Sequence, residues 1–154
     1  MFLLANDTIS GQEGKAIATI EGQVVDLFFV KTLEATFNKK KSELRTLGKK
    51  STQHKSSGWS GAGNMTLYYI SSVFRQMAVR FAKTGRDVYF NITVINDDPG
   101  SSIGKQTMVL YNCNLDSTIL ARLDTEADVL EDSVEFTFDD IDLLDAFGNP
   151  VPLA

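Results

Sequence analysis

The chain has 154 residues, of which 43% are hydrophobic and 23% charged, and its formal net charge is −5. This length suits a single domain, residues 1–154, that buries a substantial core. The acidic balance argues against a general nucleic-acid-binding protein. With Cys113 as the one cysteine, a disulfide within the chain is excluded, and its apolar neighbours predict a buried thiol. The sequence shows neither a secretory signal nor an apolar run of membrane-spanning length, so we expect a protein made in a reducing cytoplasm.

Charge is unevenly distributed along the chain. Basic side chains crowd residues 31–55, whereas acidic side chains crowd residues 116–145. Such asymmetry predicts either a charged partner or copies of one protein that meet basic end to acidic end.

The first third of the chain predicts an arm, a hairpin and a long strand. Residues 1–13 lack periodicity, which indicates an N-terminal arm that is flexible or ordered by a partner. Residues 15–20 and 23–27 flank Glu21-Gly22, a pattern typical of a hairpin. Apolar and polar residues alternate over 28–38, which predicts a strand, with 42–47 as its antiparallel partner.

Residues 48–63 have no hydrophobic rhythm and predict a long loop. Loops of this length inside a compact domain are often functional. The following residues, 64–70, predict a strand that is apolar on both faces.

The one clear helix is predicted over residues 71–84. Phe74, Met77, Ala78 and Phe81 fall on one helical stripe. Ser71 or Ser72 suits the N-terminal cap, and Gly85 suits the left-handed position that ends a helix.

The last half predicts further strands over 87–96, 106–115 and 133–139, followed by a C-terminal tail over 141–154. Many short strands with one helix favour a mainly β fold, an antiparallel β-sandwich or open barrel with one flanking α-helix.

The sequence contains no convincing catalytic or cofactor-binding motif. The glycine-rich stretches 58–63 and 99–106 each lead into a predicted strand, whereas phosphate and dinucleotide loops lead into a helix. The single histidine, His54, lies among lysines, and one histidine with one distant cysteine makes no metal-ligand cluster. We therefore expect no enzyme activity, cofactor or metal, and a hydrolase built around His54 is the weakest interpretation.

The basic stretch allows two functional interpretations besides a solvated loop. Residues 39–55 would suit a small polyanion- or nucleic-acid-binding β module, although Trp59 is the only aromatic residue close enough to stack on bases. The same stretch would suit an assembly arm that becomes ordered on contact with another copy.

The order of short motifs along nearly the whole chain resembles the tail tube protein of contractile phages and of defective-prophage or bacteriocin-type tail particles. The motifs that carry this resemblance are Thr8–Gly14, Lys31–Ala35, Lys41–Glu43, Gly48–Lys50, His54–Gly58, Leu110–Ser117 and Leu130–Asp140.

The resemblance implies a structural subunit that forms hexameric rings stacked into the inner tube of a tail. In such tubes, strands of every subunit join a β-barrel around a channel, and a long loop reaches the adjacent ring. The implied partners are further copies of the chain, sheath protein outside, tape-measure protein inside, baseplate and terminator proteins at the ends, and DNA or other cargo in passage, with no membrane.

Two groups of candidate residues follow. Contacts between rings or subunits are predicted for Lys39, Lys40, Lys41, Lys49, Lys50, His54, Lys55 and Trp59. A position facing the lumen is predicted for the polar alternation of Thr32, Glu34 and Thr36.

Overall fold

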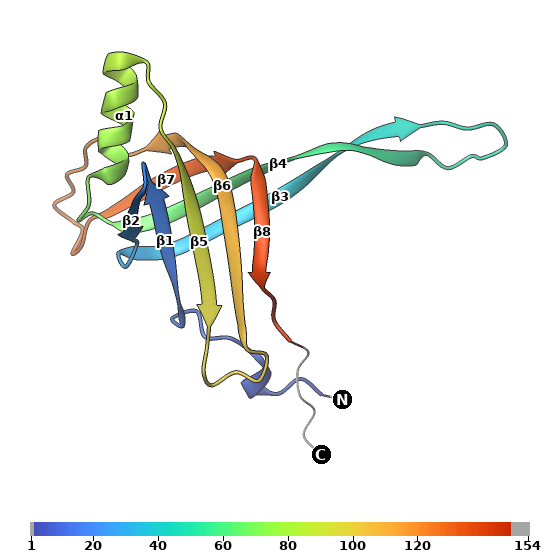
Figure 1. Cartoon of the computed structure of the whole chain (residues 1–154), viewed down its shortest axis with the longest axis horizontal. Coiled ribbons are helices and arrows are strands. Elements are labelled where there is room, and N and C mark those ends of the chain that lie inside the picture. The colour runs from blue at the N-terminus through green and yellow to red at the C-terminus, as the bar shows by residue number, and fades with distance from the viewer. Residues whose placement is uncertain (1, 149–154) are drawn as a thin grey trace.

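A computed structural model describes residues 2–148 of the chain. Within them, eight strands accompany one α-helix and one short 3-10 helix (Figure 1). In chain order these are η1 (Ala5–Asp7), β1 (Gly14–Ile20), β2 (Gln23–Asp26), β3 (Val30–Leu44), β4 (Gln53–Tyr68), α1 (Val73–Thr84), β5 (Tyr89–Asp97), β6 (Lys105–Thr118), β7 (Glu131–Phe138) and β8 (Asp140–Asp145).

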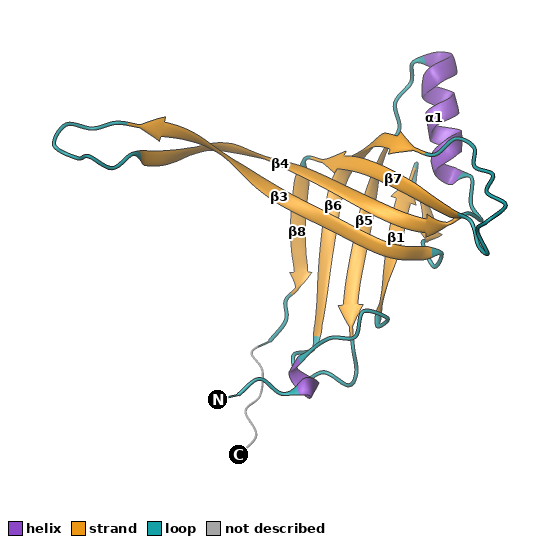
Figure 2. Cartoon of the chain, turned by 180° about the vertical axis from the view of Figure 1, so that it is seen from behind, coloured by secondary structure: helices purple, strands orange, loops and turns teal. Residues whose placement is uncertain are grey.

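All strands belong to one antiparallel sheet that folds across itself. The order is β2-β1-β5-β6-β7-β4-β3, with β8 paired to β6 beside this path. The antiparallel strands β1, β5, β6 and β8 lie roughly along one axis, and β3, β4 and β7 cross them (Figures 1 and 2). The mainly antiparallel β fold with one helix is therefore confirmed.

Strand β6 links the two groups of strands, because it changes its pairing partner along its length. Residues up to Tyr111 pair with β8, and residues from Asn114 onward pair with β7. Between them, Asn112 has a φ of 54°, a left-handed conformation that asparagine tolerates better than most residues. Its side-chain amide donates to Asp139 Oδ1 over 2.8 Å, which fixes the kink to the junction of β7 and β8.

The hydrophobic core lies between the crossing strand groups and beneath α1. Its largest fully buried side chains are Phe74, Phe90, Phe136, Met65, Leu67 and Ile92. The strand predicted over 133–139 is confirmed as β7, in which Val134, Phe136 and Phe138 are buried while the residues between them are exposed.

The helix begins and ends within two residues of its prediction. Phe74 and Met77 are buried, as the stripe requires, but Phe81 is half exposed. Ser72 makes no capping hydrogen bond through its side chain, and Ser71 Oγ instead accepts from the Val73 N–H at 3.4 Å. Gly85 takes the predicted left-handed conformation, with a φ of 69°.

The long-loop prediction is wrong for most of its length. Residues 53–63 lie in β4 and pair with β3, and residues 42–44 continue β3 instead of forming a partner strand. The connecting segment is only 45–52. Alternation of apolar and polar residues identifies a strand only where one of its faces is buried. Little of this hairpin packs against the core, so the alternation is missing.

The two chain ends also differ from expectation. Residues 141–145 of the predicted tail belong to β8, and its residues after Gly148 lie outside the described part of the structure. At the other end, Ser102 Oγ donates to Asp7 Oδ1 over 2.7 Å, and the Ser10 N–H donates to Asp98 Oδ2 over 2.9 Å. The N-terminal arm therefore contacts the β5–β6 connection of its own chain.

Candidate assembly surfaces

The outer half of the β3–β4 hairpin projects from the body. β4 pairs with β7 only from Gly61 onward, so residues 53–60 pair with β3 alone. We call residues 38–60 the arm, and Figures 1 and 2 show it extending well beyond the other strands. An isolated two-stranded hairpin is marginally stable in water, so the arm gains stability if another surface supports it.

The arm contains all eight predicted contact residues. It carries seven Lys and Arg side chains against Glu43 alone, a net charge of +6, which leaves −11 on the remainder of the −5 chain. The ion pairs of residues 2–148 join other side chains, so the arm cations have none. The structure places these predicted contact residues on the arm with exposed side chains: Lys39, Lys40, Lys41, Lys49, Lys50, His54 and Lys55.

Trp59 has a different environment from the lysines. Its ring stacks on Phe37 with centroids 5.0 Å apart and planes at 29°, and lies 6.3 Å from the ring of Phe138. The aromatic core thus continues into the base of the arm. Because one face of Trp59 is already covered, it is a poor platform for stacking nucleic-acid bases.

The predicted lumen residues lie on one polar, solvent-exposed face of the sheet. Thr32, Glu34 and Thr36 are exposed. Strand register places Glu34 beside Asn64, and Asn64 beside Glu135, on the same face. The polar surface therefore extends over β3, β4 and β7, which sequence alternation within one strand does not reveal.

The opposite face of β3 is incompletely covered. Leu33 packs against the core, but Ala35 and Phe37 further along are exposed. The outer edge of β3 also pairs with no strand among the described residues. An open edge beside exposed apolar side chains is a surface that readily pairs with another chain.

Residues 2–148 contain no group of three or more His, Cys, Asp or Glu side chains placed to hold a metal ion. In the same residues, no helix has the length and apolar character needed to cross a membrane.

Open strand edges, a polar sheet face and a self-paired basic arm are features that suit a structural subunit. The sequence profile described as "Phage tail tube protein" matches residues 1–145, and the chain belongs to this family.

A curated relative is similar over almost the full length. The phage-like element PBSX protein XkdM of Bacillus subtilis is 38% identical over 143 residues, which are 93% of this chain and 95% of XkdM. The protein YqbM of the same organism is also 38% identical over 143 residues.

Solved structures share the fold at low sequence identity. A chain of the anti-feeding prophage baseplate has a TM-score of 0.69 and 14% identity, covering 92% of this chain and 97% of that one. A chain of the PVC sheath–tube complex, an extracellular contractile injection system, has a TM-score of 0.65 and 9% identity, covering 92% and 95%. The SPP1 tail tube has a TM-score of 0.60 and 14% identity, covering 94% and 81%.

Proposed function

We propose that this tail tube subunit assembles into hexameric rings that stack into the inner tube of a contractile, phage or phage-like tail. The observation that carries the proposal is the β3–β4 hairpin, whose outer half and open edge have no partner within the described chain. Ring closure would remove the open edges by pairing them with neighbouring copies.

Known assemblies of this fold support the sixfold ring. The tail of an empty gene transfer agent particle was refined with C6 symmetry, and its matching chain has a TM-score of 0.57 and 11% identity, covering 92% of this chain. The wet face that carries Thr32, Glu34 and Thr36 then lines the channel, through which DNA or other cargo passes.

The arm makes the contact with the adjacent ring in this proposal. A head-to-tail stack is a heterologous contact, so a basic arm meets a different and acidic surface of the next copy. The charges of +6 on the arm and −11 on the remainder suit that contact.

The remaining partners follow from the place of a tube in a tail. Sheath protein surrounds it, tape-measure protein fills it before use, and baseplate and terminator proteins close its ends. Solved chains of similar fold occur in a sheath–tube complex and in the cap of the anti-feeding prophage, which supports this arrangement. The protein is synthesised in the bacterial host and resides in the tail of the particle.

Electron microscopy of the purified protein at increasing concentration tests the proposal. We expect tubes whose end views have sixfold symmetry. A protein that stays monomeric at every concentration, with or without other tail proteins, would refute it.

The arm contact is tested by reversing its charge. The triple change of Lys49, Lys50 and Lys55 to Glu should shorten tubes strongly, and rising salt should shorten wild-type tubes by screening the same attraction. A control variant carries the same charge change in the body, with Lys15, Lys83 and Arg86 changed to Glu. Its tubes should be longer than those of the arm variant. Equal tube lengths in wild type and arm variant would show that the arm does not join the rings.

A further inference from the structure

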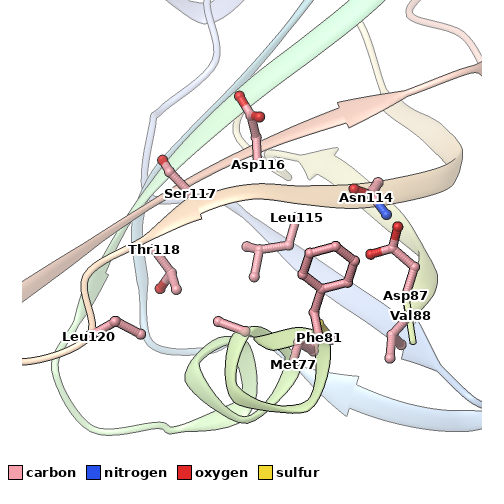
Figure 3. A pocket seen from close by; sticks show the side chains of 11 residues that line it. Met77, Phe81, Asp87, Val88, Asn114, Leu115, Asp116, Ser117, Thr118 and Leu120 are labelled. Atoms are coloured by element: carbon pink, nitrogen blue, oxygen red, sulfur yellow. The ribbon is translucent and has the colours of Figure 1, made fainter. Parts of the chain in front are cut away.

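A cleft lies between α1 and the end of β6, on the side of the body away from the arm. Its volume is about 370 Å³, at the lower end of the range for pockets that bind small ligands, so it has room for one or two apolar side chains. Met77, Phe81, Leu115 and Leu120 form apolar walls (Figure 3). Phe81 and Leu120 are 52% and 65% exposed, so this apolar surface is still accessible to a partner.

The cleft also contains polar groups without partners. Asp87 and Asp116 line it, and neither belongs to an ion pair within residues 2–148. Asn114 Nδ2 is buried without a hydrogen-bond acceptor in the same part of the chain. Buried polar atoms in native proteins are usually satisfied, so an incoming group with a carbonyl oxygen would complete this one.

The turn of the arm, residues 45–52, has the complementary properties. Leu47 is fully exposed, with a relative accessibility of 104%. A leucine side chain in solvent contributes no burial free energy to folding. Arg45, Lys49 and Lys50 flank it and have no ion pairs in the described chain. An apolar knob within a cationic turn matches an apolar cleft with a carboxylate rim.

The turn of one chain does not reach the cleft of the same chain. Figures 1 and 2 show the arm projecting to one side of the body and α1 standing at the other. An arm turn that occupies this cleft would therefore belong to a second copy.

We propose that the arm turn of one subunit docks in the α1–β6 cleft of another subunit. Leu47 fills the apolar floor, Lys49 and Lys50 face Asp87 and Asp116, and a backbone carbonyl of the turn accepts from Asn114 Nδ2. This inference rests on the proposed tube assembly and identifies the surface that receives the arm.

Disulfide trapping in assembled tubes tests the contact directly. The paired change Leu47→Cys with Ala78→Cys, in a Cys113→Ala background, places one thiol on the turn and one in the cleft. Oxidised tubes should give covalent multimers. The matched control, Leu47→Cys with Gln76→Cys, uses a helix position outside the cleft. It should give about tenfold less product, because a disulfide needs Cα atoms within roughly 7 Å.

Charge exchange provides an independent measurement that needs no cysteine. Lys49→Glu with Lys50→Glu should raise the concentration required for tube formation by about tenfold or more. Adding Asp87→Lys with Asp116→Lys should lower this concentration most of the way back to the wild-type value. The same cleft substitutions in a chain with a wild-type arm should impair assembly.

The outcomes separate the two proposals. Tubes that form without trapping at positions 47 and 78, and without rescue by charge exchange, overturn the docking and leave tube assembly intact. A wild-type protein that forms neither rings nor tubes overturns the proposed function, and the docking with it. Trapping of the 47–78 pair above its control, together with rescue, supports both.

Discussion

The ring of Phe138 lies directly over Gly61, its cross-strand partner, so that a Cβ at residue 61 would collide with the ring. Gly63 and Phe136 repeat this arrangement two residues further along the same pair of strands. The absence of side chains on β4 at these positions lets two phenyl rings lie flat against the sheet. The base of the arm is thereby joined to the core, since Trp59 packs against the outer ring of this pair.

Replacing Gly61 with alanine should therefore destabilise the protein. Alanine in a strand gains about 0.5–1 kcal/mol over glycine in backbone entropy, but overpacking a well-filled core costs about 1–3 kcal/mol. We expect the overpacking to dominate, with a net loss in urea unfolding. In a Phe138→Ala background the collision disappears, so the same Gly61→Ala change should be neutral or stabilising. Equal effects in the two backgrounds would contradict the interpretation.

Arg75 and Asp132 form the ion pair that ties α1 to β7. Nη1 of Arg75 donates to Asp132 Oδ2 over 2.6 Å, and the side chains are only 14% and 2% exposed. The guanidinium also lies 4.2 Å from the centre of the Tyr69 ring. Removing one partner of a buried pair leaves an uncompensated charge.

Arg75→Ala should cost about 3–5 kcal/mol of unfolding free energy. Arg80→Ala is the matched control on the same helix, because its pair with Glu21 is about half exposed, and it should cost no more than about 1 kcal/mol. Chemical denaturation of the two variants measures the difference. A loss for Arg75→Ala as small as that of the control would show that the pair contributes little.

The sequence predicts the body of this fold well because its strands and helix face a core. β5, β7 and α1 carry apolar periodicity, and this periodicity predicts the bounds of all three within a few residues. The kink at Asn112 was not predictable, because it follows from the exchange of strand partners along β6, a nonlocal relationship.

The sequence pattern predicts a loop where the arm forms strands, and the reason is physical. Apart from Leu44 and Trp59, residues 38–44 and 53–60 are polar or glycine on both faces, and their backbone pairing with each other makes them extended. The basic residues stand out in the sequence, but charge patterning shows neither how far they project nor that they share one hairpin. The cleft at Asn114 leaves no pattern in the sequence, because its walls come from α1, β6 and the loop after it.

Cys113 should be almost inert in the folded protein. It is fully buried, and this burial raises the pKa of its thiol from 9.0 to about 12. Because the thiolate is the reactive form, reaction with a disulfide reagent at pH 8 should be slow in buffer and fast in denaturant. Rapid labelling of the native protein would contradict the buried position.

The same shift predicts a loss of stability at alkaline pH. Between about pH 9 and pH 12 the thiol ionises in the unfolded chain but stays protonated in the folded one, so deprotonation favours unfolding. The contribution is intact below pH 9 and declines as the pH rises through this window. The stability of wild type relative to Cys113→Ala, measured by urea unfolding, should therefore fall across it. A difference that is independent of pH would contradict the prediction.

The proposed position of the polar sheet face at the channel can be tested by chemical labelling. In Thr36→Cys tubes, built in a Cys113→Ala background, a small maleimide should diffuse in from the ends and label the new thiol. A maleimide carrying a large polymer should be excluded from a channel enclosed by stacked rings. The same variant before assembly should react with both reagents, because Thr36 is exposed on the isolated subunit. Labelling of intact tubes by the bulky reagent, to the extent seen with dissociated protein, would place this face on the outside and contradict the assignment of Thr32, Glu34 and Thr36 to the lumen.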